Sequence, residues 1–410
     1  MSNITQYFNC RILQDHNLVW EDLWVRDGII EDPRELFFKE KTSPQFRVDC
    51  NGLIISPGYL DIQLNGGFEV DFSSNVENVE DGVQKVSRGL LQYGVTSFCP
   101  TIVTSPDSVY KQVVPKIKTI EYEDGAGVLG VHLEGPFIST EKRGAHPVKY
   151  IKSMNGGYQS IIETYGDIKN VCIVTLAPEL EQSAEVIKKL TEKNIAVSLG
   201  HSMANLMEAE KAVNQGAKLI THLFNAMLPF HHRDPGLVGL LTSHNISGKQ
   251  IYYGLIADGI HTDPAAIRIA YKANPKGLIL ITDAIAAMGL KPGTYQLGQQ
   301  CVTIKNSGAY LAGSNVLAGS IANMAQCVRF FQYASGASLE DVLEMATLHP
   351  ALLLGVEKNK GTLDYGSDAD FILLNDELYV QATYIAGKKV YEAPNLTTEK
   401  FLLPAAVSDN

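Results

Sequence analysis

Four polar residues, each placed shortly after a short apolar run, have the types that metal-assisted hydrolysis requires: Glu134, His201, His222 and Asp283. A carboxylate at the end of a buried strand costs free energy unless it is paired, and a metal ion is its strongest partner. One carboxylate and two imidazoles can hold a divalent ion and leave a fourth position open for water. A separate carboxylate can take a proton from that water and pass it to a leaving group. We therefore expect a metal site with a proton acceptor beside it.

Each of these residues alone has a simpler explanation. A lone Glu134, followed by the strand-breaking pair Gly135-Pro136, is more often an N-cap or half of a salt bridge. A lone His beside a strand is more often a hydrogen-bonded core residue, which we expect of His132 and His349. Asp283 alone could cap the loop that follows it. The repetition of the pattern at successive runs favours the metal site over these alternatives.

Three further clusters have the character of substrate contacts: Gly144-Ala145-His146, Asn225-Ala226-Met227 and Asp258-Gly-Ile-His261. The second of them leads to Arg233, which lies beside His231 and His232 and concentrates positive charge in an acidic chain. Arg presents its donors in a fork that matches phosphate. A solvated loop explains the same residues equally well.

Alternating apolar runs and helical patterns must position these residues. The runs are 54–63, 95–103, 128–133, 171–177, 195–199, 217–222, 251–257 and 278–282. Helical spacing separates them, as in Val79, Val83, Val86 and Leu90, before a stop at Gly94. Strands alternating with helices predict an α/β fold with a (β/α)₈ barrel over 54–358, whose strand ends converge on one mouth. An open doubly wound sheet is the rival, although no Gly-x-Gly-x-x-Gly follows the first run.

Both ends of the chain have the pattern of short strands and turns. Residues 1–53 and 359–410 are expected to pair as one small β-sandwich domain, with a Gly-rich hairpin inserted in the barrel at 293–316. The pattern Ser338-x-x-Asp341 predicts the start of a late helix. We assign no role to the tail beyond Glu392.

The composition narrows the class of protein. The 410 residues carry 34 basic and 45 acidic side chains, for a net charge of −11. This balance argues against nucleic acid or an anionic membrane as a partner. Six scattered cysteines without a Cys-x-x-Cys pair are expected to be reduced. No apolar run approaches the roughly 20 residues of a membrane span, so we expect a cytoplasmic protein.

Seven motifs resemble those of the N-acetylglucosamine-6-phosphate deacetylase family, a branch of the amidohydrolase superfamily, over essentially the whole chain. They are Pro57-Gly-Tyr-Leu-Asp-Ile-Gln-Leu-Asn-Gly66, His132-Leu-Glu-Gly-Pro-Phe137, Gly200-His-Ser202, Thr221-His-Leu-Phe-Asn-Ala-Met227, Asp258-Gly-Ile-His261, Thr282-Asp-Ala284 and Leu317-Ala-Gly319. Most amidohydrolases carry His-x-His at the end of strand one, whereas this chain has Asp61-x-Gln63. That departure resembles the deacetylase branch with a single metal.

The resemblance implies an activity and a set of roles. The activity is removal of the acetyl group from N-acetyl-D-glucosamine 6-phosphate to give D-glucosamine 6-phosphate and acetate, in amino-sugar catabolism. The implied ligands of one divalent ion per subunit, zinc by the resemblance, are Glu134, His201 and His222. Asp283 is implied to act as general base and then general acid. His146 would polarise the acetamide carbonyl, and Gln63 would position the water.

The resemblance also implies how the substrate is bound. The implied contacts are Ala145, His146, Asn225, Ala226, Arg233, His261, Leu317, Ala318 and Gly319. Arg233 would grip the phosphate by reaching into the active site of a neighbouring subunit, which implies a homodimer. Two alternatives stay open. Another amidohydrolase-superfamily hydrolase or deaminase would usually carry the missing His-x-His, and a non-catalytic scaffold on the same fold would be expected to lack the metal ligands.

Overall fold

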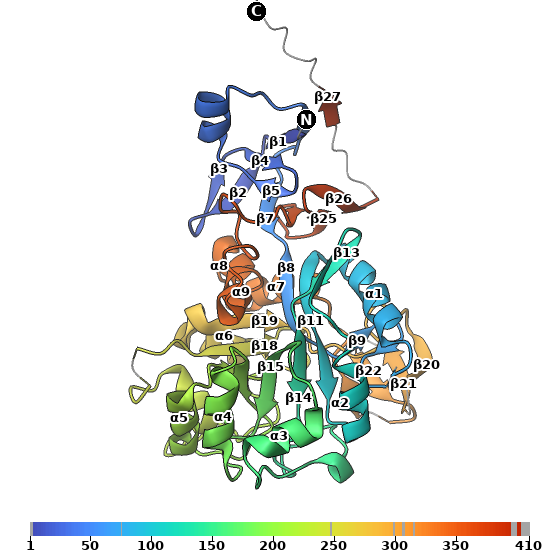
Figure 1. The fold of residues 1–410 in the computed structure, drawn as a ribbon, viewed down its shortest axis with the longest axis vertical. Helices are drawn as coiled ribbons and strands as arrows, with labels where there is room; N and C mark the ends of the chain where they lie inside the picture. The colour runs from blue at the N-terminus through green and yellow to red at the C-terminus, as the bar shows by residue number, and fades with distance from the viewer. Residues whose placement is uncertain are drawn as a thin grey trace, which may run out of the picture.

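The chain folds into a β domain stacked on a larger α/β domain, as Figure 1 shows. The structure is a computed structural model and describes residues 3–74, 76–246, 248–297, 300–305, 308–314, 316–394 and 400–402. The expected tail beyond residue 402 lies outside the described residues. Within them, no helix combines the length and the apolar character needed to cross a bilayer.

A curled parallel sheet forms the centre of the α/β domain. Its strands follow one another in sequence order: β8 (Tyr59–Leu64), β11 (Val95–Val103), β14 (Val131–Glu134), β15 (Val171–Leu176), β16 (Ala196–Leu199), β17 (Leu219–Ile220), β18 (Tyr252–Ile256) and β19 (Leu278–Ile281). Two short strands, β13 (Gly125–Val128) and β12 (Ile120–Tyr122), extend the sheet beside β11. Nearly all residues of these parallel strands are buried, as is usual where helices cover the sheet.

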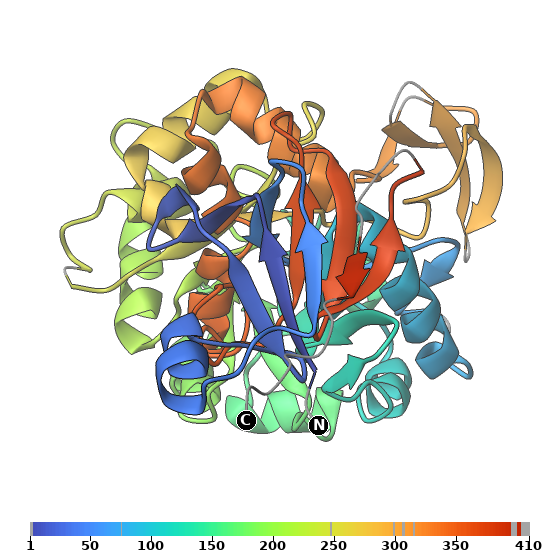
Figure 2. The same ribbon diagram turned by 90° about the horizontal axis from the view of Figure 1, so that it is seen from above.

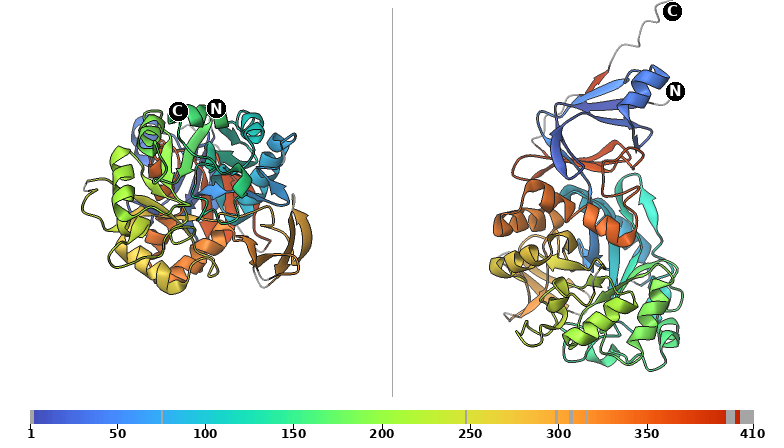
Figure 3. Two further views of the ribbon diagram at one scale, coloured as in Figure 1. Left: turned by 90° about the horizontal axis from the view of Figure 1, so that it is seen from below. Right: turned by 90° about the vertical axis from the view of Figure 1, so that its left-hand side faces the viewer.

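Helices surround this sheet on its outer side (Figure 3). They are α1 (Val79–Leu90), α2 (Asp107–Val113), α3 (Tyr158–Tyr165), α4 (Ser183–Thr191), α5 (Leu206–Gln215), α6 (Pro264–Ala273), α7 (Met324–Ser335), α8 (Leu339–Glu344) and α9 (Leu348–Leu354). The predicted spacing is confirmed in α1, where Val79, Val83, Val86 and Leu90 are all buried. Gly94 then adopts a left-handed conformation with φ of 76° and turns the chain into β11.

The two edges of the curled sheet, β8 and β19, meet over a short distance. At their ends the backbone N–H of Asp283 donates to the Gln63 carbonyl at 2.9 Å, and Leu64 bridges Ala284. Closer to the strand starts, Leu280 and Leu60 donate instead to the carbonyls of the 345–346 segment. A strand of the parallel ladder can pair with only one neighbour on each side, so this segment interrupts a continuous β8–β19 ladder. The structure therefore has a curled α/β sheet whose seam is partly occupied by another segment.

Both ends of the chain build the β domain, as the sequence predicts. One sheet runs β27 (Lys400–Leu402), β6 (Phe46–Asp49), β1 (Ile4–Phe8), β4 (Leu23–Arg26) and β5 (Ile29–Ile30). The other runs β26 (Lys388–Glu392), β25 (Val380–Ile385), β24 (Phe371–Leu374), β7 (Ile54–Pro57), β2 (Arg11–Gln14) and β3 (Asn17–Trp20). Tyr7 packs edge-on against Phe371 with ring centroids 5.0 Å apart, and Phe371 stacks on Tyr384 at 4.4 Å. The apolar run 54–63 is thus divided between β7 of this domain and β8 of the curled sheet.

A small antiparallel sheet projects from one side of the α/β domain (Figure 2). Its strands are β20 (Gly293–Leu297), β21 (Gln300–Lys305), β22 (Gly308–Leu311) and β23 (Leu317–Gly319). The sequence predicts a hairpin here, and the structure has two further antiparallel strands, β22 and β23. A bridge from Ala284 to Ser320 ties this sheet to the end of β19. Further on, the predicted cap is confirmed, because the Ser338 side chain accepts from the Asp341 N–H at the start of α8.

Candidate active site

The carboxyl ends of the parallel strands bring three of the predicted residues into contact. Glu134 is the last residue of β14, and His201 and His222 each come two residues after the end of a strand. Oε1 of Glu134 lies 2.9 Å from Nε2 of His201 and 3.2 Å from Nε2 of His222, and the two Nε2 atoms are 3.0 Å apart. All three side chains are at most 4% exposed. The structure thus brings the three side chains into contact, as the sequence predicts.

The backbone turns sharply at three of these strand ends. His201, His222 and Asp283 have φ angles of 49°, 26° and 47°, in the left-handed region that residues with a Cβ rarely adopt. Each such turn aims a side chain across the mouth rather than along the strand. Such conformations cost on the order of 1–3 kcal/mol each and gather at functional sites. Gly200 is required beside His201, because a Cβ there would lie 2.6 Å from the Thr221 Cβ.

The donor set fits a cation. Nδ1 of His201 lies 2.9 Å from the Lys142 carbonyl, which can only accept, so Nδ1 carries the proton and Nε2 offers a lone pair. That lone pair faces a carboxylate oxygen and a second imidazole nitrogen. Burial would raise the pKa of Glu134, but its contacts with His146, His201 and His222 hold it well below the ordinary value. An ionised oxygen and an imidazole lone pair that meet in a buried site are typical of metal ligation.

The two imidazoles respond differently to this environment. Burial, with the nearby His146, lowers the pKa of His201 to about 4. Burial also opposes charge on His222, but hydrogen bonding to Glu134 and the charge of that carboxylate raise its pKa to about 8. Nδ1 of His222 has no hydrogen-bond partner among the described residues. A neutral His201, protonated on Nδ1, presents its Nε2 lone pair to the Glu134 oxygen, and a bound cation would satisfy both of these acceptors.

His146 approaches the same carboxylate from another side. Glu134, His146 and His201 also form a set of potential ligands within 4.8 Å of one another. However, Nε2 of His146 is 3.8 Å from Oε1 of Glu134, farther than either of the other two imidazoles. Nδ1 of His146 lies 2.7 Å from the Thr104 hydroxyl and 3.4 Å from the Thr104 N–H, which hold the ring from behind. Because His146 is the farthest of the three imidazoles from the carboxylate, we favour His222 over it as a ligand.

Asp283 lies beside this cluster and is connected to it through Gln63. Nε2 of Gln63 donates to Oε2 of Glu134 at 3.1 Å and to Oδ1 of Asp283 at 3.2 Å. Asn65, which the sequence analysis did not single out, donates to the same Oδ1 at 2.8 Å. Burial, helped by the negative charge of Glu134, raises the pKa of Asp283 to about 6. Asn65 falls within the quoted motif 57–66, so a signal for it was present in the sequence.

A cavity of about 600 Å³ opens above these groups. Its lining contains Glu134, Ala145, His146, His201, His222, His261, Asp283, Ala318 and Gly319, all of which the sequence analysis selected. Thr104, Lys149 and Tyr150 also line it and were not expected. His261 is anchored from behind, because its Nδ1 lies 2.6 Å from Oδ2 of Asp258. Burial opposes charge on His261, but this hydrogen bond raises its pKa above the ordinary value.

Other selected residues lie outside that lining. Gln63 lies beneath it, and Leu317 precedes the lining residues of β23. Asn225 and Ala226 are half-buried, and the Ala226 carbonyl accepts from the Ser202 N–H at 3.1 Å. Arg233 is exposed on the loop after β17 and does not line the cavity of its own chain.

Two residues that were set aside as core histidines fit that expectation. His132 is 1% exposed, and its ring contacts the Ile62 carbonyl and the Thr175 hydroxyl at 3.1 and 2.8 Å. Burial lowers the pKa of His132 to about 4. His349 contacts the Leu278 carbonyl at 2.7 Å. Both rings thus have local hydrogen-bond partners, as expected of histidines that pack in the core.

The curled parallel sheet with one carboxylate, two imidazoles and a separate Asp at its strand ends defines a metal-dependent hydrolase. The chain belongs to the amidohydrolase family, which it matches over residues 54–390. It is 57% identical over 391 residues to N-acetylglucosamine-6-phosphate deacetylase of Danio rerio, covering 95% of this chain and 97% of that protein. The human enzyme of the same name is 58% identical over 395 residues, covering 96% and 97%.

Solved structures of the same enzyme are similar in fold. The structure from Pasteurella multocida is 30% identical with a TM-score of 0.81, covering 94% of this chain and 99% of that one. A mutant from Mycobacterium smegmatis, in complex with N-acetyl-D-glucosamine-6-phosphate, is 27% identical with a TM-score of 0.80 and covers 95% and 99%. The amidohydrolase fold of these neighbours combines a barrel-type α/β domain with a β domain.

Proposed function

We propose that this chain is an N-acetylglucosamine-6-phosphate deacetylase, which hydrolyses N-acetyl-D-glucosamine 6-phosphate to D-glucosamine 6-phosphate and acetate. The observation that carries the proposal is the convergence of Glu134, His201 and His222 on one buried point beside Asp283, in a chain 57% identical to an enzyme of that name. An amide is a poor electrophile and an amine a poor leaving group. Hydrolysis therefore needs an activated water, a stabilised oxyanion and a proton for the amine.

We assign Glu134, His201 and His222 as the ligands of one divalent ion per subunit, with zinc as the proposed metal. The mixed carboxylate and imidazole set suits zinc among the common divalent ions. When bound, such an ion supplies Lewis acidity, which makes water more acidic and stabilises negative charge. Nδ1 of His201 is held by the Lys142 carbonyl, and this contact orients the ring toward the ion.

Asp283, His146 and Gln63 have the proposed roles around the reacting bond. Asp283 accepts a proton from the attacking water and returns it to the leaving amine. A raised pKa suits this double role, because an acid near neutrality both accepts and donates readily. Nε2–H of His146 donates to the acetamide carbonyl oxygen as charge develops there. Gln63, held between Glu134 and Asp283, positions the water.

The proposed substrate contacts surround the cavity. They are Ala145, His146, Asn225, Ala226, His261, Leu317, Ala318 and Gly319. Arg233 is proposed to bind the phosphate in the active site of a neighbouring subunit, so the working form is a homodimer. Its exposure on a loop away from its own cavity supports this assignment. Phosphate binding away from the reacting bond would hold the amide in position.

Three further assignments follow from the family. We propose that β8 and β19 close the curled sheet as a (β/α)₈ barrel despite the short seam. The proposed domains are 1–53 and 359–410, together a β sandwich, and 54–358. A cytoplasmic location is supported by the acidic composition and by cysteines that are all free.

The direct test is incubation of metal-loaded protein with N-acetyl-D-glucosamine 6-phosphate and measurement of acetate release. Unphosphorylated N-acetyl-D-glucosamine serves as the matched substrate, because it shares the amide and lacks only the phosphate. We expect acetate from the first compound and far less from the second. No acetate from metal-loaded, folded protein would contradict the proposal.

A further inference from the structure

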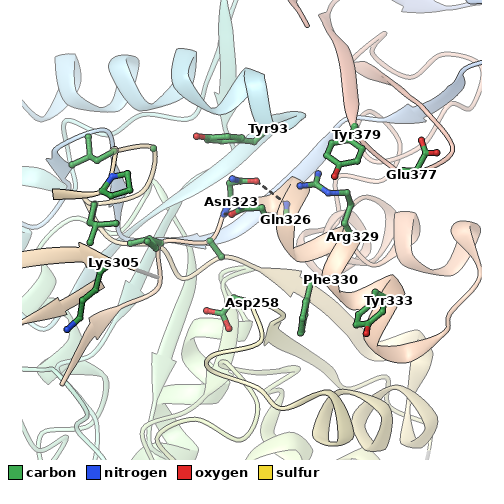
Figure 4. A pocket seen from close by; sticks show the side chains of 17 residues that line it. Tyr93, Asp258, Lys305, Asn323, Gln326, Arg329, Phe330, Tyr333, Glu377 and Tyr379 are labelled. Atoms are coloured by element: carbon green, nitrogen blue, oxygen red, sulfur yellow. Dashed lines mark hydrogen bonds between the residues drawn. The ribbon is translucent and has the colours of Figure 1, made fainter. Parts of the chain in front are cut away.

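A second cavity, of about 760 Å³, lies outside the catalytic one between α7, the four-stranded insert and the β24–β25 loop (Figure 4). Neither the metal ligands nor Asp283 line it. The two cavities share a wall of three chain segments. Asp258, Ala287 and Asn323 face the second cavity, and close neighbours of each in sequence, His261, Ala286 and Ser320, face the catalytic one.

Arg329 of α7 is the charged group that distinguishes this cavity. Cζ of its guanidinium lies over the Tyr379 ring, 4.2 Å from the centroid, and both side chains are visible in Figure 4. In the described part of the chain, it forms no salt bridge or hydrogen bond. Acidic residues outnumber basic ones by 45 to 34, so most cations can find a carboxylate. A half-buried guanidinium without one keeps its forked donors for an external anion.

Aromatic rings and amide groups complete the wall. Phe330 and Tyr333 stand next to each other with ring centroids 6.4 Å apart, and Tyr333 is 82% exposed. Asn323 and Gln326 use their amide oxygens to cap α7, which leaves their NH₂ groups without a partner among the described residues. Exposed rings beside amide donors favour a ligand with a flat ring and polar edges.

The carboxylates near this cavity limit the charge of the ligand. Asp258 lines it but is occupied, because it accepts from the N–H groups of Ile260 and His261 and from the His261 ring. Glu377 lies at the exposed edge. With Lys305 and Arg329 as the cations of the lining and Asp258 and Glu377 as its acids, the charges balance, which suits a single phosphate or carboxylate and disfavours a polyanion.

The shared wall offers a route from this cavity to catalysis. Asp258 holds Nδ1 of His261 at 2.6 Å, and His261 lines the catalytic cavity. Phe330 packs on the same turn, since a Cβ at Gly259 would lie only 2.7 Å from its Cζ. A ligand that moved Phe330 would therefore press on the turn that carries His261. We propose that this second cavity binds a ring-bearing organic anion, a phosphomonoester or a carboxylate, and that His261 responds to its binding.

Calorimetric titration of the metal-loaded protein tests the binding site without requiring turnover. The probes are adenosine 5′-phosphate and benzoate as ring-borne anions, adenosine as a ring without the anion, and inorganic phosphate as an anion without the ring. At least one of the first two should bind more tightly than the last two. Whichever binds identifies the anion as phosphomonoester or carboxylate. Arg329→Gln should weaken its binding at least about tenfold, while Arg88→Gln, an equal charge change on exposed α1, should not.

A second measurement tests the link to catalysis. The imidazole NMR signal of His261, assigned by its loss in His261→Gln, should shift when the bound probe is added to wild type and stay fixed in Arg329→Gln. The proposal is overturned if neither ring-borne anion binds, or if binding survives Arg329→Gln. It is equally overturned if binding is lost in His146→Asn but not in Arg329→Gln, which would place the probe in the catalytic cavity. Binding through Arg329 without a shift of the His261 signal overturns the link.

Discussion

Two groups of charges in this molecule, one around the buried Lys360 and one around the buried Glu134, are built in opposite ways. At the domain junction, Nζ of Lys360 contacts Asp370, Asp368 and Glu121 at 2.5, 2.9 and 3.1 Å, so each ammonium donor has an acceptor. At the carboxyl ends of the parallel strands, the Glu134 carboxylate faces two imidazole nitrogens, and Nε2 of His201 is an acceptor because its Nδ1 carries the proton. The first group is satisfied within the chain, whereas the second contains two facing acceptors, Glu134 and His201, that a cation would satisfy.

The difference indicates which buried charges are structural and which are functional. Burial alone would lower the pKa of Lys360, but the charges of Asp370 and Glu121 raise it above the ordinary value. The native contacts therefore favour the charge that the lysine already carries. Around the Glu134 carboxylate, by contrast, the pKa of His201 is lowered and the pKa of His222 is raised. A cluster of side chains whose pKa values are shifted in opposite directions is a candidate site for binding and catalysis.

Removal of the metal should have the largest effect of the changes proposed, and it acts on the proposed site at the carboxyl ends of the parallel strands. Elemental analysis of pure protein is expected to give one divalent ion per chain. Chelation should abolish acetate release, and an ion at about 1,000 times its Kd contributes about 4 kcal/mol to unfolding free energy. Re-addition of zinc should restore both. Two ions per chain, or full activity after chelation, would contradict the one-ion site.

Asp283→Asn should keep the fold and the metal but lose turnover. The change is nearly isosteric and removes the proton acceptor, so kcat should fall by ~10²–10⁴. The measurement is kcat for acetate release together with metal content. Asp167→Asn, the same substitution at an exposed position, is the control and should retain full activity. Turnover within a few-fold of wild type would show that Asp283 is not the base.

Lys360→Met should have the opposite effect to Asp283→Asn. It should lower the free energy of unfolding and leave kcat unchanged. Removing the cation leaves Asp370, which is 6% exposed, without its partner, at an expected cost of about 3–5 kcal/mol. Denaturant unfolding measures the loss, and kcat per folded molecule should be unchanged. Lys358→Met, an equal charge change at an exposed site, should cost much less. A fall in kcat with unchanged stability would make the junction part of the active site.

Arg233→Ala is expected to have the smallest effect, on substrate binding. A forked contact to phosphate should be worth on the order of 2 kcal/mol. A solvated loop Arg would change binding by ~0–1 kcal/mol. The kcat/KM for N-acetyl-D-glucosamine 6-phosphate should fall sharply, while that for the unphosphorylated sugar should hardly move. If both fall together, the loop is structural.

Mixing experiments with the same variant test the proposed dimer. Arg233→Ala, weakened in substrate binding, and Asp283→Asn, which loses turnover, should together regain some activity as hybrid dimers, because one site then receives both intact residues. Subunit exchange is measured separately, for instance by fluorescence energy transfer between labelled subunits. Exchange without recovery of activity would place Arg233 in the site of its own subunit.

The sequence was sufficient to predict that four polar side chains lie together, because the position of each one depends on its nearest strand. Glu134, His201, His222 and Asp283 each follow a buried run, and parallel strands bring such ends to one edge. The helix Val79–Leu90 and the cap at Ser338 were equally readable, since spacing and capping depend on near neighbours.

The rest depends on contacts between distant parts of the chain. Nothing near residues 345–346 indicates that their carbonyls will accept from Leu60 and Leu280 and occupy the seam. The same holds for the division of the run 54–63 between two sheets and for the pairing of β23 with β22. The second cavity lies between segments that are far apart in sequence, so no local pattern announces Arg329 as unpaired.

The left-handed turns at His201, His222 and Asp283 have a consequence for how the chain evolves. Asn and Gly tolerate this conformation better than His, so at positions 201 and 222 they would relieve strain while removing the proposed ligands. Stability and activity therefore pull these two positions in opposite directions. A lineage released from the need for the reaction is expected to drift first to Asn or Gly at positions 201 and 222. Its descendants would be more heat-resistant than the working enzyme, and thermal unfolding of metal-free His222→Asn against metal-free wild type measures that tendency directly.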